Sequence, residues 1–182
     1  MPLISIIGCE VFSKEVSQLL GKDGDIENLI VINEKNSDIV KQFHDLGVKY
    51  EDLSPEMLPL GLKKRKGLNV IVDLQSVSLH SDYSRIKKET YEKIRFYGKV
   101  SSGILLLYGI HNDAFADVLS DFGKSKFQLV ALTCAEDELK DKGVCDCSMG
   151  GIDDGLLSPH VLEAYEQSYD VLKKKLTDKE KT

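Results

Sequence analysis

Tryptophan is absent from this sequence, and proline, methionine and cysteine are scarce. The 182 residues include four Pro, three Met and four Cys, together with 14 Gly, and no stretch is of low complexity. Apolar residues make up 42% of the chain, which suffices for a hydrophobic core without a disulfide or a metal to hold the fold. The length predicts one domain.

Surplus positive charge and long hydrophobic runs are also missing. The formal net charge is −6, whereas a general nucleic-acid binder needs excess Lys and Arg to neutralise phosphates, so we expect no nucleic-acid partner. The apolar runs are shorter than a membrane span and the chain starts without a basic leader. We therefore expect a cytoplasmic protein with no membrane partner and with reduced cysteines.

Three motifs of common enzyme classes do not occur. The sequence has no G-x-G-x-x-G and no G-x-x-x-x-G-K-[ST], so dinucleotide-binding and P-loop functions have no support from motifs. It also lacks G-x-S-x-G, the nucleophile motif of α/β-hydrolases, so the sequence argues against that class of enzyme.

What the sequence does contain is an alternation of β-rich runs with amphipathic helical patterns. The runs predict strands at residues 3–9, 29–33, 69–74, 103–110 and 127–133. Helical spacing predicts helices that begin at Ser13, Ser37, Ser81 and Asn112, and a last helix with Ser158 as its cap and Pro159 as its first helical residue. We expect a doubly wound, Rossmann-like α/β/α fold: a three-layer open sheet of about five mostly parallel strands, with the most apolar run, 103–110, at its centre. The domain is expected to span residues 1–176, followed by a charged tail at 177–182 that frays.

Reactive side chains follow the predicted strands at their carboxyl ends. In a parallel sheet these ends share one edge, where open α/β sheets bind their ligands. Thiolates and imidazoles are the ligands that Zn²⁺ and other thiophilic metals prefer. The candidate metal ligands at this edge and in the loop above it are Cys9, His111, Cys134, Cys145 and Cys147.

Polar residues of the same edge are candidates to bind a cofactor or to support a metal. The candidate cofactor-binding residues are Glu10, Asn112, Asp113 and Gly150. Glu10, Glu136 and Asp146 are the nearest carboxylates that could orient a ligand or act as a general base. Gly150 belongs to a Gly- and Asp-rich run that either cradles an ion or is a loop of ordinary turn residues.

Structural explanations compete with these roles. Cys9 and Cys134 also fit plain core positions, because free cysteine is commonly buried. Cys145 and Cys147 lie in a polar stretch, where a metal or redox role competes with an unused thiol pair. His111 also fits a helix start or a packing position. The Tyr-bearing face of the last predicted helix leaves a homodimer open.

Three segments carry a resemblance to a known family: Ile6–Phe12 (IIGCEVF), Leu53–Leu58 (LSPEML) and Ile104–Gly109 (ILLLYG). They resemble an uncharacterised archaeal and bacterial domain family that is common in methanogens and often encoded near corrinoid-dependent methyltransferases. That family has a Cys-bearing, Gly-rich turn after its Tyr-Gly pair and a later Asp-Cys pair. Tyr108-Gly109 and Asp146-Cys147 look like these positions.

The chain departs from the family at the turn, where it has His111 and no cysteine. A histidine in place of a cysteine still permits Zn²⁺ or cobalt as the metal. The resemblance implies a one-carbon or methyl-transfer setting, with a corrinoid as cofactor or a methyltransferase protein as partner. It implies no particular reaction.

Three hypotheses about function follow from the sequence. The first is a metal-binding protein with a Cys/His cluster at the sheet edge, holding zinc or another thiophilic metal in corrinoid or one-carbon metabolism. The second is a non-catalytic protein that binds a small ligand or regulates a methyltransferase system. The third is a thiol-dependent enzyme in which one cysteine is the nucleophile and His111 its base.

Overall fold

Six strands and six helices organise the part of the chain that the computed structural model describes, which is residues 2–32, 38–62, 65–76, 78–79, 82–108, 115, 117–132 and 159–180. The strands are β1 (Leu3–Cys9), β2 (Ile26–Val31), β3 (Glu51–Asp52), β4 (Leu68–Gln75), β5 (Gly103–Leu107) and β6 (Gln128–Leu132). The helices are α1 (Ser13–Lys22), α2 (Asp38–Asp45), α3 (Leu58–Gly61), α4 (Tyr83–Tyr97), α6 (Val118–Asp121) and α8 (Pro159–Glu180). Two 3₁₀ turns, η1 (Glu10–Phe12) and η2 (Pro55–Met57), precede α1 and α3.

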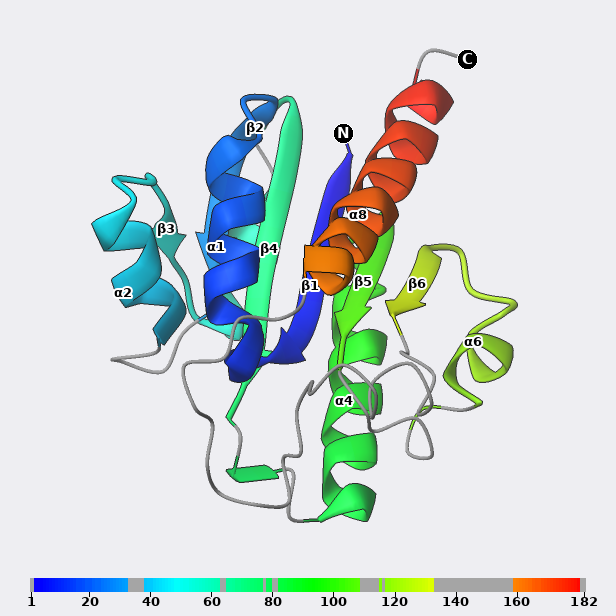
Figure 1. The fold of residues 1–182 in the computed structure, drawn as a ribbon. Coiled ribbons are helices and arrows are strands. Elements are labelled where there is room, and N and C mark those ends of the chain that lie inside the picture. Colours follow the sequence, from blue (N-terminus) through cyan, green and yellow to red (C-terminus); the bar gives the residue numbers. More distant parts are fainter. Residues whose placement is uncertain are drawn as a thin grey trace.

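The strands form one sheet in the order β3-β2-β4-β1-β5-β6 (Figure 1). Each neighbouring pair in this order is parallel. All seven residues of β1 are buried, because a parallel strand is covered by helices on both faces. The predicted α/β class, with a parallel sheet and helices around it, is confirmed.

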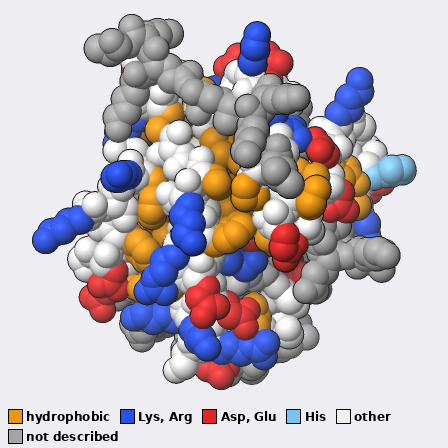
Figure 2. Space-filling view, turned by 180° about the vertical axis from the view of Figure 1, so that it is seen from behind, with side chains coloured by type: hydrophobic (Ala, Val, Ile, Leu, Met, Phe, Trp, Pro, Cys, Tyr) orange, Lys and Arg blue, Asp and Glu red, His pale blue; other side chains and the backbone are white. Residues whose placement is uncertain are grey.

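Different helices cover the two faces of the sheet. Gly103 faces α8, since a Cβ atom built on this glycine would lie 2.8 Å from a side-chain carbon of Leu172. On the opposite face Gln75 contacts Thr90 of α4 through a hydrogen bond. Figure 1 shows α1 and α8 on the near side of the sheet, and Figure 2 shows the far side, where hydrophobic side chains gather in the middle among charged ones.

The prediction that residues 103–110 form the central strand is wrong. The two middle strands are β4 and β1. β5 lies next to the edge strand β6, and it ends at Leu107. A continuous apolar run reports burial on both faces of a strand, and β5 has this burial without being central. The apolar character of a strand therefore does not fix its place in the order.

Several boundaries also differ from the sequence pattern. β2 begins at Ile26, and the short strand β3 lies in a segment where no strand was predicted. α4 begins after Asp82, whose side chain caps the helix by accepting a hydrogen bond from the Arg85 amide at 3.0 Å. α8 begins at Pro159 as predicted and continues to Glu180, past residue 176, where the apolar pattern of the sequence ends. Its last turns are rich in Lys, which favours helix.

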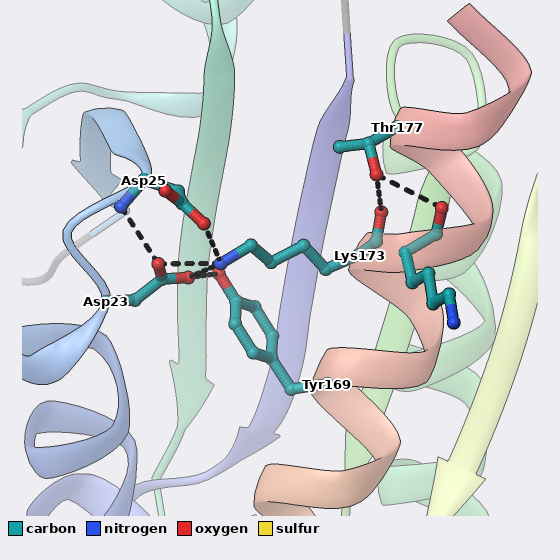
Figure 3. A network of polar contacts seen from close by, with 6 residues as sticks. Asp23, Asp25, Tyr169, Lys173 and Thr177 are labelled. Atoms are coloured by element: carbon teal, nitrogen blue, oxygen red, sulfur yellow. Dashed lines mark hydrogen bonds and ion pairs between the residues drawn. The ribbon is translucent and has the colours of Figure 1, made fainter. Parts of the chain in front are cut away.

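A polar network anchors α8 at the amino-terminal edge of the sheet (Figure 3). Asp23 lies between α1 and β2, and it accepts hydrogen bonds from Tyr169 at 2.8 Å and from Lys173 at 2.7 and 2.8 Å. Asp25 makes a second ion pair with the same lysine at 2.8 Å. Within the described residues, no helix is long and apolar enough to cross a membrane.

Candidate functional site

The order of the strands reverses between β1 and β4. After β1 the chain adds β2, β3 and β4 on one side of it, and then β5 and β6 on the other side. In open α/β sheets the carboxyl ends of the strands beside such a reversal bound the crevice in which ligands bind. Here those ends are Cys9 and Gln75, which are partners in the parallel register.

The segments that follow β1 and β4 are joined by polar side chains, those of Glu10, Ser76 and Ser78, which we call the rim. Ser76, directly after β4, donates a hydrogen bond from Oγ to Glu10 Oε1 at 3.1 Å. Ser78 Oγ donates to Ser76 Oγ at 3.2 Å. The Glu10 carbonyl accepts a bond from Ser13 Oγ at 2.5 Å, which holds the η1 turn against the start of α1. Ser76 and Ser78 are exposed and Glu10 is half-buried, so solvent reaches the rim.

Below the rim, three polar side chains meet on the face of the sheet that α4 covers. Gln75 Oε1 accepts hydrogen bonds from the Tyr108 hydroxyl and from Thr90 Oγ1, the latter at 3.1 Å. Thr90 Oγ1 also lies 3.0 Å from the Tyr108 hydroxyl. Tyr108 directly follows β5, so this group draws on β4, on the end of β5 and on α4. We call these three residues the floor cluster.

Among the residues that the structure describes, the amide nitrogen of Gln75 has no hydrogen-bond partner, and the residue is only 4% exposed. In the described part of the chain, the other buried side-chain atom in this condition is Glu15 Oε2 of α1. A buried polar group without a partner costs about 1–3 kcal/mol, so native structures keep few of them. The unpaired amide therefore marks the floor cluster as a place for a further polar group.

Cys9 ends β1 on the same face as Gln75 and is fully buried. Burial raises the pKa of its thiol to about 12, with a smaller increase from the neighbouring Glu10 carboxylate. A thiol with this pKa is protonated at neutral pH, and it is the thiolate that binds metals and attacks electrophiles. These surroundings are those of a core residue, and a ligand role for Cys9 stays a prediction.

The remaining candidates lie outside the described residues. They are His111, Asn112, Asp113, Cys134, Glu136, Cys145, Asp146, Cys147 and Gly150. Within the described ranges, no group of His, Cys, Asp and Glu side chains is arranged to hold a metal ion. The structure thus places Cys9 and Glu10 at one edge and brings Glu10 to Ser76.

Sequence reasoning missed the floor cluster. Gln75 was outside the predicted strand, and Tyr108 was assigned to the interior of one. A signal was present, because Asp73 and Gln75 alternate with apolar residues and so place two polar side chains on one face of a buried strand. Such a pattern indicates a polar partner on the covering helix, and α4 supplies Thr90 and Lys93.

Asp73, two residues before Gln75 in β4, adds a polar side chain to the same face of the sheet. Asp73 Oδ2 accepts hydrogen bonds from Lys93 Nζ at 2.5 Å and from the Tyr97 hydroxyl at 2.6 Å, and its side chain is buried. The ammonium group of Lys93 balances this carboxylate. It is therefore engaged with Asp73 and does not give the floor cluster an additional positive charge.

No protein family and no curated protein matches this chain in sequence. Among solved structures, the chain is similar to the signal recognition particle receptor FtsY from Elizabethkingia anophelis, crystallised in complex with GDP. The two share 12% identity at a TM-score of 0.39, over 71% of this chain and 48% of the receptor chain. The chain thus spans about half the length of that protein, and a likeness at this level bears on neither family nor activity.

Proposed function

We propose that this chain is a binding protein for a small polar ligand, which it holds at the carboxyl edge of β1, β4 and β5. The observation that supports it is the convergence of Glu10, Gln75, Ser76 and Tyr108 at the point where the strand order reverses. Open α/β sheets bind ligands at this place because several loops and helix starts meet there. Ser76 and Ser78 are exposed to solvent, whereas Gln75, Thr90 and Tyr108 are buried.

The chemistry of these groups favours recognition over reaction. Hydroxyl and amide groups orient a ligand through hydrogen bonds, and Glu10 is the one carboxylate among the rim and floor residues described above. Burial raises the pKa of Tyr108 well above its ordinary value, so its hydroxyl is a hydrogen-bond donor and not a base at neutral pH. The proposed role is therefore non-catalytic.

Native mass spectrometry of gently purified protein tests the proposal. We expect a non-covalent mass on the wild-type chain that is released on denaturation. Glu10→Gln and Ser76→Ala should each reduce its retention by about tenfold, because each removes one hydrogen-bonding group of the rim. Ser120→Ala is the matched control, since this serine is exposed on α6 and its hydroxyl donates to the Asp117 carbonyl of its own turn, and it should retain the ligand. Equal masses under native and denaturing conditions for every variant would contradict the proposal.

A second candidate function is the binding of a thiophilic metal, and the strand order favours it. β1, β5 and β6 are neighbours in the sheet, and all three point their carboxyl ends to the same edge. In the sequence, Cys9 ends β1, His111 comes after β5 and Cys134 comes after β6. The predicted ligands thus follow three adjacent strands, and thiolate and imidazole ligands suit Zn²⁺ or cobalt.

Elemental analysis of anaerobically purified protein tests this second function. Near-stoichiometric zinc, iron or cobalt is expected, with thiols that titrate only after a chelator is added. Cys134→Ser should lose most of the metal, whereas His44→Gln should keep it, because His44 is exposed on α2. Metal-free protein in which the thiols of Cys134, Cys145 and Cys147 titrate freely without a chelator would rule the metal out. If the chain acts in corrinoid-dependent methyl transfer, we also expect it to co-purify with a corrinoid or methyltransferase protein.

A further inference from the structure

In the structure, the Gln75 amide points its oxygen at the hydroxyl groups of Tyr108 and Thr90. With Oε1 toward Tyr108 and Thr90, the tyrosine hydroxyl donates to Oε1 and the threonine hydroxyl donates to the tyrosine oxygen or to Oε1. Every hydroxyl proton then has an acceptor. In this orientation Nε2 has no partner among the described residues, and its two N–H groups require an acceptor.

The electrostatic surroundings restrict what that acceptor is. Burial raises the pKa of Tyr108, the hydrogen bond with Thr90 lowers it, and the carboxylates of Asp73 and Glu89 raise it further. The nearby cation, Lys93, is paired with Asp73, and the rim adds the carboxylate of Glu10. Among the described residues, an anion placed against Nε2 would find no unpaired positive partner to offset its desolvation, which is costly. An uncharged acceptor does not carry this cost.

We propose that the floor cluster recognises an uncharged carbonyl group of the ligand, such as that of a carboxamide, through a hydrogen bond from Gln75 Nε2. This inference rests on the proposed ligand site and names the chemical class that the site takes. The rim residues Ser76 and Glu10 then contact the more polar part of the same molecule. They directly follow β4 and β1, whose last residues, Gln75 and Cys9, are partners in the sheet. The specificity comes from the cost of leaving the buried amide unpaired when an analogue lacks the carbonyl group.

Acetamide and acetate are suitable probes, because they have the same size and shape and differ in charge. The side-chain amide signals of Gln75 in ¹⁵N-labelled wild-type protein, assigned by their loss in Gln75→Glu, report on contact with Nε2. We expect acetamide to shift these signals with an affinity at least about tenfold greater than that of acetate. Equal or tighter binding of acetate would overturn the inference. So would the absence of any shift together with a long-lived water bound to this amide.

The compound retained by the purified chain provides an independent readout. Gln75→Glu keeps an oxygen for the Tyr108 and Thr90 hydroxyls but replaces the N–H donor with a second acceptor. We expect this variant to retain at least about tenfold less of the compound than wild type. Mass analysis should identify a molecule with an uncharged carbonyl group. If the retained compound is a carboxylate or phosphate whose binding depends on Glu10 and Ser76, the ligand site stands and this inference fails. If nothing is retained by any variant, the ligand site itself fails.

Discussion

Asp23 and Lys173 are separated by 150 residues in sequence and form an ion pair in which the lysine Nζ contacts both carboxylate oxygens, at 2.7 and 2.8 Å. Asp23 directly follows α1. At the other end of this helix, Phe12 makes an edge-to-face ring contact with Tyr165 at a centroid distance of 5.4 Å. The C-terminal helix α8 therefore contacts both ends of α1, and through Phe12 it supports the turn that carries Glu10.

Replacing Asp23 should weaken this anchor in a pH-dependent way. Burial raises the pKa of Asp23, but hydrogen bonds from Lys173, from the Asp25 amide and from Tyr169 outweigh it, and the net pKa lies below the ordinary value. A carboxylate with a lowered folded-state pKa stabilises the fold above its unfolded-state pKa of about 3.9, and this contribution is lost as pH falls through the folded-state pKa. We expect Asp23→Asn to lower the free energy of unfolding by about 1–3 kcal/mol at pH 7. Urea unfolding at pH 7 and at pH 2–3 measures the difference, which should shrink in acid.

Lys173→Met tests the other half of the pair. Burial lowers the pKa of Lys173, but Asp23 and Asp25 raise it above the ordinary value. Its contribution is thus present below the unfolded-state pKa of about 10.4 and is lost as pH rises through the folded-state pKa. Lys175→Met is the control, because Lys175 is exposed on the same helix. A Lys173 variant as stable as this control at pH 7 would show that the network in Figure 3 contributes nothing.

The ion pair between Lys93 and Asp73 should hold α4 on the sheet. Removing one partner of a buried pair leaves an uncompensated charge, which costs about 3–5 kcal/mol at fully buried sites. Because the Lys93 side chain is 30% exposed, we expect Lys93→Met to cost less, about 1–3 kcal/mol. Adding Asp73→Asn should recover part of this loss, since the uncompensated charge is then gone. Thermal unfolding of both single variants and the double variant gives the coupling, with exposed Lys88→Met as control. Additive losses would contradict it.

Glycine at position 8 should be required by the close approach of β5. A Cβ atom at Gly8 would lie 2.7 Å from the carbonyl oxygen of Leu107 and 2.9 Å from its Cβ. These are atoms of the neighbouring strand and cannot move aside without shifting the sheet, so Gly8→Ala should lower the free energy of unfolding by about 1–3 kcal/mol. Gly24→Ala has no atom within 4 Å of the new Cβ and should change it by about 0.5 kcal/mol or less. Equal stabilities of the two variants in urea would refute the argument.

Local patterns in the sequence were enough to predict the class of fold. Strand β1 and the start of α8 at Pro159 appear where they were expected, because a buried apolar run and a proline at the first helical position are local signals. The strand order was not predictable in this way. It depends on which helix covers which face, and β5 is as apolar as a central strand although it lies beside the edge strand.

The candidate site was only partly predictable for a similar reason. Glu10 was found because it follows a strand, which is a rule of position along the chain. Gln75 and Tyr108 were missed because their role comes from a contact between the sheet and α4, across residues that are far apart in sequence. Residue type alone also suggested a ligand role for Cys9. Its burial and raised thiol pKa are properties of the assembled core.

The thiol of Cys9 should be unreactive in the native protein. A rise in pKa from 9.0 to about 12 lowers the thiolate fraction at pH 8 by a factor of about 10³, and burial excludes the reagent as well. We expect alkylation of Cys9 by iodoacetamide, followed by peptide mass spectrometry, to proceed only as fast as the chain unfolds and to accelerate in urea. The Cys9→Ala variant identifies its peptide. If a chelator alone makes Cys9 reactive without unfolding the chain, the residue is a metal ligand and not a core thiol, and the second candidate function gains its first ligand.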